Sequence, residues 1–225
     1  RFAGSDKKTF VTLDETPVWL HSARLFASHA DVRQTIVVIS PSDLALFSER
    51  FSAEIARLGV EVIPGGDQRS DSVQNGLAAV SSTAELVAIH DGARPCFTIE
   101  IFQAVVDAAR KTGAAIPAVP LNSTVKRVKQ LRLIETTVDR SDLFLAQTPQ
   151  VFRRDIIQEA YQNRGAFQPT DEASLLEDQG VPVEVVAGSK FNIKITQPED
   201  LRFAAACLAA IKPAQFDSQI DNKLR

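Results

Sequence analysis

Residues 89–95, read as IHDGARP, place an acid, a glycine and a cation directly after an apolar run. Asp91 is suited to hold a hard cation such as Mg²⁺, and Arg94 is suited to bind a phosphate or a carboxylate. The preceding residues 86–88 are typical of a buried strand, and ligands of open α/β sheets bind beyond the carboxyl ends of such strands. The segment predicts an anion site, and a polar turn with an exposed ion pair explains it equally well.

A second candidate site, residues 65–72, lies between an expected strand and an expected helix. Its two glycines let a ligand approach the backbone closely, and a helix start offers N–H groups without partners. Asp67 and Ser72 can read a base or a sugar through hydrogen bonds. A tight turn followed by a helix cap is the alternative interpretation.

Further cations occur at the start of the chain and near its end. Arg1, Lys7 and Lys8 lie in a Gly/Ser-containing segment that could wrap a triphosphate, although a frayed basic terminus is the simpler interpretation. Lys194 lies at the edge of an expected strand, where it is either part of a solvated face or a phosphate ligand.

Hydroxyl groups and one more arginine occur in segments between expected elements. Arg140 and Thr148 lie in non-helical segments, and Thr170 could cap a helix whose N-terminus favours anions. Each signal is weak alone. Together with the lysines they provide the separate cations and hydroxyls that a site for two anionic substrates needs.

Composition narrows the classes of function. The chain has 225 residues, of which 44% are hydrophobic and 24% charged. One large domain or two small ones can therefore form a hydrophobic core without disulfides or structural metals. A net charge of −3 argues against a nucleic-acid-binding domain. The two cysteines and three histidines form no disulfide framework or zinc motif. Because no apolar run is long enough to span a membrane, we expect no membrane partner and a cytoplasmic location.

Strands and helices alternate in the first half of the chain. We expect strands at 35–40, 60–64, 86–90 and 114–119, and helices at 43–58 with Ser42 as cap, at 70–80, and from a Thr98 cap to about 111. This alternation predicts a doubly wound, mostly parallel sheet with right-handed crossovers.

The pattern changes in the second half. Residues 124–128 and 131–135 predict a hairpin with too few apolar residues for a central strand, so we expect an arm that packs on a partner subunit. We then expect helices at 154–162, 171–178 and 198–211, strands at 183–186 and 192–195, and a polar tail. The predicted organisation is a single domain, 1–211, with an arm at 121–140 and a tail at 212–225.

The order of the motifs resembles one known family, 2-C-methyl-D-erythritol 4-phosphate cytidylyltransferase of the non-mevalonate isoprenoid pathway. The similarity runs from Arg1 to about Ile211 through the basic start, GGDQRSDSVQNGL at 65–77, IHDGARP at 89–95, STVKRV at 123–128, TVDRSDLFLAQTPQVF at 137–152, TDEASLLE at 170–177 and NIKITQPEDL at 192–201. The IHDGARP block alone would also suit related pyrimidine-nucleotide transferases. The resemblance implies a Rossmann-like fold of the nucleotide-diphospho-sugar transferase type.

The resemblance also implies a reaction. The phosphate of methylerythritol phosphate attacks the α-phosphate of CTP in line, with Mg²⁺ present, and pyrophosphate leaves. The product is 4-diphosphocytidyl-2-C-methyl-D-erythritol. No covalent intermediate with the protein is expected, so positioning and charge neutralisation carry the catalysis.

Residue roles follow from the matched positions. The catalytic cations are Arg1, Lys8 and Lys194. The CTP-binding residues are Gly66, Asp67 and Ser72 around the cytosine and Asp91, Gly92 and Arg94 near the triphosphate, with Asp91 also as the metal ligand. The residues around methylerythritol phosphate are Thr124, Arg140, Thr148, Thr170 and Lys194. In the family the arm crosses to a second subunit, so the resemblance implies a homodimer in which Arg140 serves the neighbouring site.

Two departures from the family pattern concern the start of the chain. The family opens with a strand and a Gly-rich loop directly before the position of Arg1, and we expect such a segment upstream in the natural protein. Lys7 replaces the usual proline before Lys8, which makes the site more positive.

Three alternatives remain open at this point. One is a ribitol-5-phosphate cytidylyltransferase of the same fold, which the TVDR and TDEAS blocks favour less. The second is a nucleotide-binding or dimerisation module without activity. The third is that this domain forms one half of a bifunctional enzyme.

Overall fold

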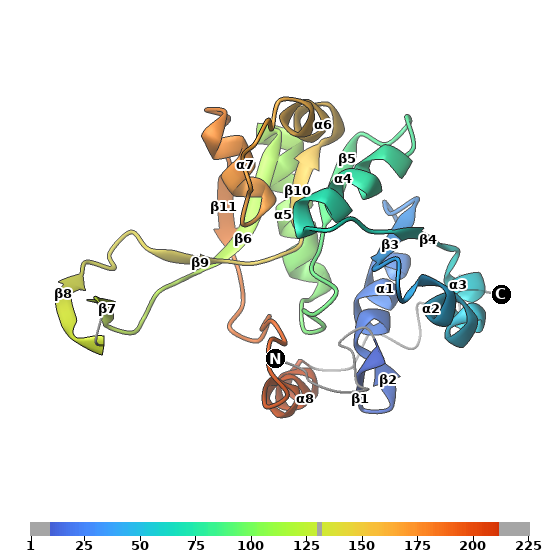
Figure 1. Cartoon of the computed structure of the whole chain (residues 1–225), viewed down its shortest axis with the longest axis horizontal. Helices are drawn as coiled ribbons and strands as arrows, with labels where there is room; N and C mark the ends of the chain where they lie inside the picture. The colour runs from blue at the N-terminus through green and yellow to red at the C-terminus, as the bar shows by residue number, and fades with distance from the viewer. Residues whose placement is uncertain (1–9, 130–131, 212–225) are drawn as a thin grey trace.

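The computed structural model describes residues 10–129 and 132–211. They form an α/β fold from which a long arm projects (Figure 1). The helices are α1 (Val18–Ser28), α2 (Leu44–Arg50), α3 (Ser52–Leu58), α4 (Arg69–Ala79), α5 (Ile99–Thr112), α6 (Arg154–Gln162), α7 (Glu172–Asp178) and α8 (Asp200–Ala210). The strands are β1 (Thr12–Leu13), β2 (Thr16–Pro17), β3 (Thr35–Ile39), β4 (Val60–Pro64), β5 (Leu86–Ile89), β6 (Ala114–Pro120), β7 (Val125–Val128), β8 (Ile134–Val138), β9 (Phe144–Ala146), β10 (Gln150–Arg153) and β11 (Glu184–Ala187).

The main sheet has the strand order β11-β6-β10-β5, with β9 paired to β6. Strands β11 and β6 pair in parallel, and β10 is antiparallel to both β6 and β5. Strands β5, β6 and β11 therefore run in one direction, as a Rossmann-like sheet requires, and β10 runs against them. The α/β class predicted from the sequence is confirmed. The reversed strand β10 was not predicted, because its four residues follow no helical crossover.

Helices cover both faces of this sheet. On one face, α5 buries Phe102, Val105 and Val106, whose spacing of three and four residues forms one apolar stripe. On the other face, α6 and α7 bury Ile157 and Leu176 against Phe152 of β10. The predicted Thr98 cap of α5 is confirmed, since the Ile101 N–H donates to its hydroxyl at 3.4 Å.

Strands β3 and β4 form a separate parallel pair. A cavity of about 1040 Å³ lies between β3 and β5 and is also lined by Trp19 and Phe26 of α1. Within residues 10–129 and 132–211, no strand pairs with the edges of β3 and β5 that face this cavity. The cavity reaches Asp91 and Lys194, so it adjoins the predicted anion site.

The helix predicted at 43–58 is two helices, which is a correction. The backbone breaks at Phe51, which has φ −112° and ψ 22°, and Asp43 instead of Ser42 precedes the first turn. The break lets Phe51 pack against Phe47 and Trp19, with ring centroids 4.9 and 5.5 Å apart. Aromatic packing therefore overrides the helical pattern of the sequence at this point.

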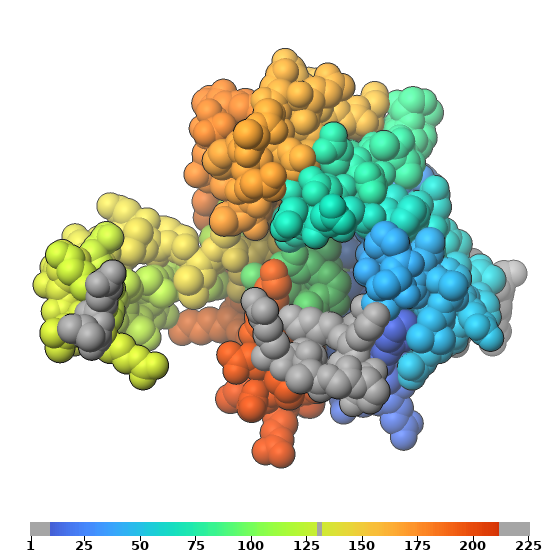
Figure 2. All heavy atoms as spheres, in the orientation of Figure 1, coloured from blue at the N-terminus to red at the C-terminus, as the bar shows by residue number. Residues whose placement is uncertain are grey.

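The arm, described at residues 121–129 and 132–140, stands clear of the rest of the molecule on the face shown in Figure 2. Strands β7 and β8 pair antiparallel, with a register shift between Arg127 and Val128. The hairpin was predicted, but β8 begins at Ile134 and ends at Val138, three residues later than expected at each end. The projecting arm is thus present as the alternating pattern indicated.

The segment expected as a strand at 192–195 is a loop, which is a second correction. One backbone hydrogen bond, from Ile195 N–H to the Ala93 oxygen at 2.9 Å, ties it to the 89–95 segment. The last helix begins at Asp200, two residues later than Pro198, where the sequence indicated the start. Among the described residues, no helix is long and apolar enough to cross a membrane.

Candidate functional site

Asp91 lies at the centre of a group of cations that reach it from three segments. The Lys194 Nζ is 2.8 Å from its Oδ2, and the Arg69 Nε is 3.2 Å from its Oδ1. The Arg94 Nε lies 3.6 Å from Oδ2. Arg69 begins helix α4, Arg94 follows β5, and Lys194 belongs to the loop before α8. The fold thus brings together residues that are far apart in the sequence.

The charges around Asp91 keep it ionised. Burial by itself would raise the pKa of the carboxyl group, but the hydrogen bond from Lys194 and the charge of Arg69 lower that pKa to about 2. Asp91 therefore carries its charge at neutral pH and holds the surrounding cations in fixed directions.

A second carboxylate, Glu172, extends this group. Arg69 donates to both of its oxygens, from Nη1 at 2.7 Å and from Nη2 at 2.9 Å, while the Tyr161 hydroxyl donates to Oε1 at 3.1 Å. Glu172 is fully buried. Three cations thus face two carboxylates in what we call the Asp91 cluster: Arg69, Asp91, Arg94, Glu172 and Lys194. The three cations suit an anionic ligand, and Asp171 adds a third carboxylate on the wall of the neighbouring pocket.

His90 fixes the hydroxyl of Thr148. The carbonyl oxygen of Arg94, 3.0 Å from the His90 Nε2, can only accept, so Nε2 carries the proton. The Nδ1 of His90 then accepts from the Thr148 hydroxyl at 3.0 Å, and this hydroxyl accepts from the Asp91 N–H at 3.0 Å. Burial lowers the pKa of His90 to about 4, which keeps the ring neutral at physiological pH.

A pocket of about 170 Å³ opens beside the cluster. Among its lining residues are five of the residues singled out in the sequence, namely Asp91, Arg94, Thr148, Thr170 and Lys194, together with Arg69. The structure therefore places cations and hydroxyls from distant motifs around one volume. This is the arrangement expected for the phosphate end of a small substrate.

Strand β10 positions the wall of the pocket that contains Thr170. Gln150 of β10 donates to Asp171 Oδ2 at 2.8 Å and accepts from the Ala173 N–H at 3.1 Å. Asp171, not Thr170, caps helix α7 through a hydrogen bond from Ser174 N–H at 2.9 Å, which corrects the predicted cap. The Thr170 side chain therefore does not cap the helix, and Thr170 lines the pocket.

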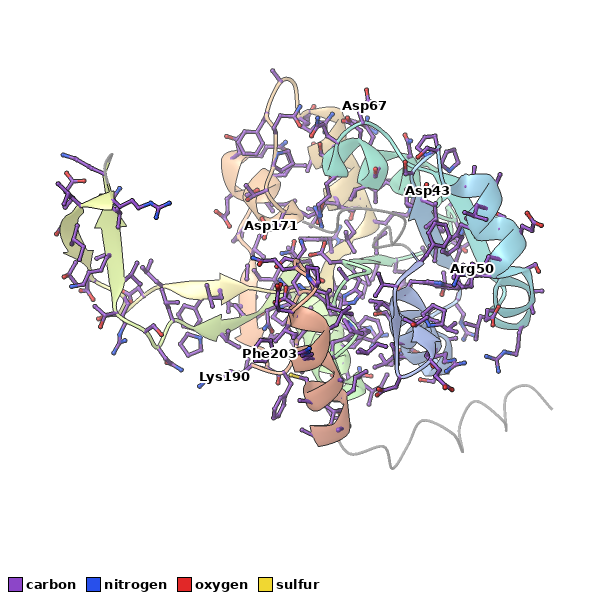
Figure 3. The ribbon with its side chains drawn as sticks, turned by 60° about the horizontal axis from the view of Figure 1, so that its bottom comes forward. Asp43, Arg50, Asp67, Asp171, Lys190 and Phe203 are labelled. Carbon is purple, nitrogen blue, oxygen red and sulfur yellow. The ribbon has the colours of Figure 1, made fainter. Side chains whose placement is uncertain are left out.

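The 65–72 segment forms a tight turn before α4. The Gly66 N–H donates to the Ser72 hydroxyl at 3.1 Å, and a Cβ on Gly66 would lie 2.5 Å from the Asp71 Cβ. Gly66 is thus needed because any larger residue would collide with Asp71 in the first turn of helix α4. Asp67 is exposed and stands at the outer edge of the fold (Figure 3), so its carboxylate is accessible to a ligand.

Not every predicted site residue lies near the pocket. Thr124 and Arg140 lie at the base of the arm and are exposed, and the Arg140 guanidinium donates to the Asn122 carbonyl oxygen within the arm. Gly92 is exposed beside Asp91. The predicted cations Arg1, Lys7 and Lys8 lie outside the described residues.

The site also contains Arg69, Glu172 and His90, to which the sequence assigned no role. Arg69 and Glu172 are 103 residues apart, and His90 and Thr148 are 58 apart. Local spacing cannot pair them. The one local signal was that Arg69 and Glu172 stand inside the two motifs GGDQRSDS and TDEAS, next to residues that had been singled out.

A metal ion near Asp91 would have to be shared with a ligand. Among residues 10–129 and 132–211, no group of three His, Cys, Asp or Glu side chains surrounds one point. Mg²⁺ in nucleotide sites is held by one or two carboxylates together with phosphates and water. Both Asp91 oxygens face cations, Oδ1 toward Arg69 and Oδ2 toward Lys194 and Arg94, so a metal ion bound to Asp91 would have to replace one of these contacts.

Comparison with known proteins identifies the family. The family model described as IspD, 2-C-methyl-D-erythritol 4-phosphate cytidylyltransferase, matches residues 1–210. The chain belongs to this family. The proteins of that name from Syntrophus aciditrophicus and Geobacillus thermodenitrificans are 41% and 40% identical to it, over 92% of this chain and 90% and 91% of theirs.

Solved structures agree with this family. The 4-diphosphocytidyl-2C-methyl-D-erythritol synthase from Anaerococcus prevotii has a TM-score of 0.80 at 29% identity, covering 92% of each chain. The 2-C-methyl-D-erythritol 4-phosphate cytidylyltransferase from Thermus thermophilus has a TM-score of 0.78 at 30% identity, covering 90% of this chain and 94% of that one. The resemblance predicted from the ordered motifs is thereby confirmed, and the chain is a nucleotidyltransferase of the IspD family.

Proposed function

We propose that the protein transfers CMP from CTP to 2-C-methyl-D-erythritol 4-phosphate, releasing pyrophosphate and forming 4-diphosphocytidyl-2-C-methyl-D-erythritol. The observation that carries this proposal is the Asp91 cluster beside the 170 Å³ pocket in a member of the IspD family. A phosphate monoester and a triphosphate repel each other, so their reaction needs fixed cations between them.

The reaction is a single displacement at phosphorus. A phosphate oxygen of the polyol phosphate forms a bond to the α-phosphorus of CTP while the bond from that phosphorus to the bridging oxygen breaks. Lys194, 40% exposed at its side chain and 2.8 Å from Asp91, is the cation best placed to neutralise the α-phosphate. Arg1 and Lys8 are proposed to do the same from the start of the chain. Catalysis is then positioning and charge neutralisation.

The two substrates are assigned to neighbouring sites. Gly66, Asp67 and Ser72 are proposed to bind the cytosine, while Asp91, Gly92 and Arg94 face the triphosphate. The polyol phosphate is proposed to occupy the 170 Å³ pocket, where Thr148, Thr170 and Lys194 line the wall. Because the Thr148 hydroxyl proton is held by His90, Thr148 would act toward the substrate as an acceptor.

Enzymes of this nucleotidyltransferase family generally use a divalent cation. We propose Mg²⁺, held by Asp91 together with CTP phosphates. When bound, the ion would neutralise charge on the triphosphate and stabilise the departing pyrophosphate.

We also propose a homodimer formed through the arm. Its exposed apolar side chains include Val128, Leu133 and Ile134, and Phe144 and Leu145 of the adjoining strand β9 add to them, each at least 52% exposed. A two-stranded hairpin is marginally stable by itself, so such side chains need a covering surface. A second copy would cover them and would bring Thr124 and Arg140 to the neighbouring pocket.

Oligomeric state tests the dimer directly. The variant Ile134→Asp places a charge among these side chains, and we expect it to elute as a monomer at concentrations where the wild type is a dimer. Leu46→Asp, on a side chain that is 55% exposed on helix α2, is the matched control and should leave the dimer intact. A monomeric wild type would contradict the proposal.

Substrate choice tests the reaction. The protein is incubated with CTP, Mg²⁺ and either methylerythritol phosphate or ribitol 5-phosphate, and pyrophosphate release is measured. We expect turnover of methylerythritol phosphate. Exclusive turnover of ribitol phosphate would establish the related transferase instead, and CTP binding without any turnover would establish a binding module. A cytoplasmic location, which the substrates suggest, is tested by cell fractionation.

A further inference from the structure

Arg69 is in contact with groups from both proposed substrate sites. It is the first residue of helix α4, directly after the turn that is assigned to the cytosine. Its Nε donates to Asp91, beside the proposed triphosphate position, at 3.2 Å. Its two Nη atoms donate to Glu172, the first residue of helix α7, next to the pocket assigned to the polyol phosphate.

Glu172, the partner of the Arg69 Nη atoms, is held rigidly. Glu172 is fully buried and also accepts from the Tyr161 hydroxyl at 3.1 Å. Asp171, its neighbour, is held by Gln150 of strand β10 at 2.8 Å. Because a guanidinium is planar and donates in fixed directions, a bidentate contact on an immobile carboxylate also fixes where Nε points.

The orientation of Asp91 depends on this contact. Arg69 takes its Oδ1, so Oδ2 faces Lys194 at 2.8 Å and Arg94 at 3.6 Å. Without Arg69, the carboxylate could rotate, and Lys194, whose side chain is 40% exposed, would rotate with it. The cation proposed to face the α-phosphate would then lose its fixed direction.

We propose that Arg69, held by Glu172, is a positioning residue for cytidylyl transfer. It aligns Asp91 and Lys194 and keeps helix α4 and helix α7 at one spacing, so that the two substrates meet in line. This inference rests on the proposed function, and it assigns to Arg69 an effect on the chemical step instead of on the binding of either substrate.

Helix α4 offers a matched control for anchoring alone. Arg164 Nη2 lies 3.0 Å from Asp71 Oδ1 and ties the same end of α4 to the loop after α6. Arg164 and Arg69 are both partly buried arginines paired with a carboxylate. In the described residues, no contact is found between Arg164 and Asp91 or the 170 Å³ pocket. If kcat fell merely because helix α4 was held less firmly, it would therefore fall in Arg164 variants too.

The experiment compares Arg69→Lys, Glu172→Gln and their double variant with Arg164→Lys. Initial rates give kcat and both KM values, and thermal unfolding reports the fold. Displacement of reacting groups by about 1 Å can cost about 10²-fold, so we expect kcat to fall by about that factor in each single variant, with both KM values within about threefold. In the double variant, kcat should be little lower than in either single variant, because both changes break the same ion pair between Arg69 and Glu172. In Tyr161→Phe, which keeps the ion pair between Arg69 and Glu172, kcat should fall by less than about tenfold.

Four results would overturn the inference. These are an unchanged kcat in Arg69→Lys and Glu172→Gln, a raised KM for CTP with normal kcat, multiplicative losses in the double variant, or an equal fall in kcat in Arg164→Lys. A wild-type protein that releases no pyrophosphate would overturn the proposed function and this inference with it. An active wild type with unaffected Arg69 variants would overturn the inference alone.

Discussion

The Asp91 cluster and the arm contrast in how their side chains are held. In the cluster, charged groups from distant segments bind one another, and Asp91 and Glu172 are 12% and 0% exposed at their side chains. In the arm, strands adjacent in the sequence pair with each other, and Ile134 and Leu133 are 63% and 66% exposed. In Figure 1 the arm, with strands β7 and β8, extends away from the layers of helices and strands.

The contrast separates two kinds of candidate binding residue. Lys194 and Thr148 have their positions fixed by partners within the same chain. Thr124 and Arg140 are exposed on the arm, away from the pocket of their own chain. Residues of the first kind can act in one subunit, whereas those of the second kind would reach a substrate in the proposed dimer.

The largest effect is expected from Lys194→Ala. Removing a cation that faces the reacting phosphate typically costs about 10²-fold or more, so kcat should fall by about that factor. Lys190→Ala is the matched control, because Lys190 is an exposed lysine of the same loop and is absent from the pocket lining (Figure 3). A normal kcat with a raised KM would show that Lys194 binds substrate without acting on the transition state.

A smaller effect is expected from Arg140→Ala. A charge-assisted contact with a phosphate contributes about 1.5–3 kcal/mol, so KM for the polyol phosphate should rise by about tenfold or more while KM for CTP stays nearly constant. The opposite pattern would show that the two substrate sites are assigned the wrong way round.

Mixing the last two variants tests whether the site is shared. In a heterodimer of Lys194→Ala and Arg140→Ala chains, one pocket receives both wild-type residues if the arm crosses to the partner. Refolded or co-expressed mixtures should then recover activity well above that of either variant alone. Activity that stays at the average of the two would place Arg140 and Lys194 in the site of one chain.

The smallest effect concerns stability. His90 has a pKa lowered to about 4 by burial, against 6.5 in the unfolded chain. Between these values the unfolded chain binds a proton that the folded chain excludes, so the free energy of unfolding should decline by about 3 kcal/mol as pH falls from 6.5 to 4. Denaturation of His90→Asn should show a shallower decline. An identical pH dependence would mean that folding does not lower the pKa of His90.

Periodic stretches predicted much of the architecture. Strands β3, β4, β5 and β6 lie where apolar runs indicated them, and the Thr98 cap and Gly113 bound helix α5. The failures have particular physical causes. Helix 43–58 breaks at Phe51 because an aromatic cluster forms there, and residues 192–195 form a loop in which Asn192 is fully buried. Such tertiary contacts leave no periodic signal in the sequence.

By itself the sequence determined the family, the α/β class and half of the residues that line the pocket, because motifs and periodicity are local properties. The tertiary structure alone decided that Arg69 forms an ion pair with Glu172, 103 residues away, and that His90 accepts a hydrogen bond from Thr148. It also decided that Arg140 is exposed on the arm and does not line the pocket of its own chain. Ion pairs and hydrogen bonds form between groups within a few ångströms in space, and only the folded chain sets those distances.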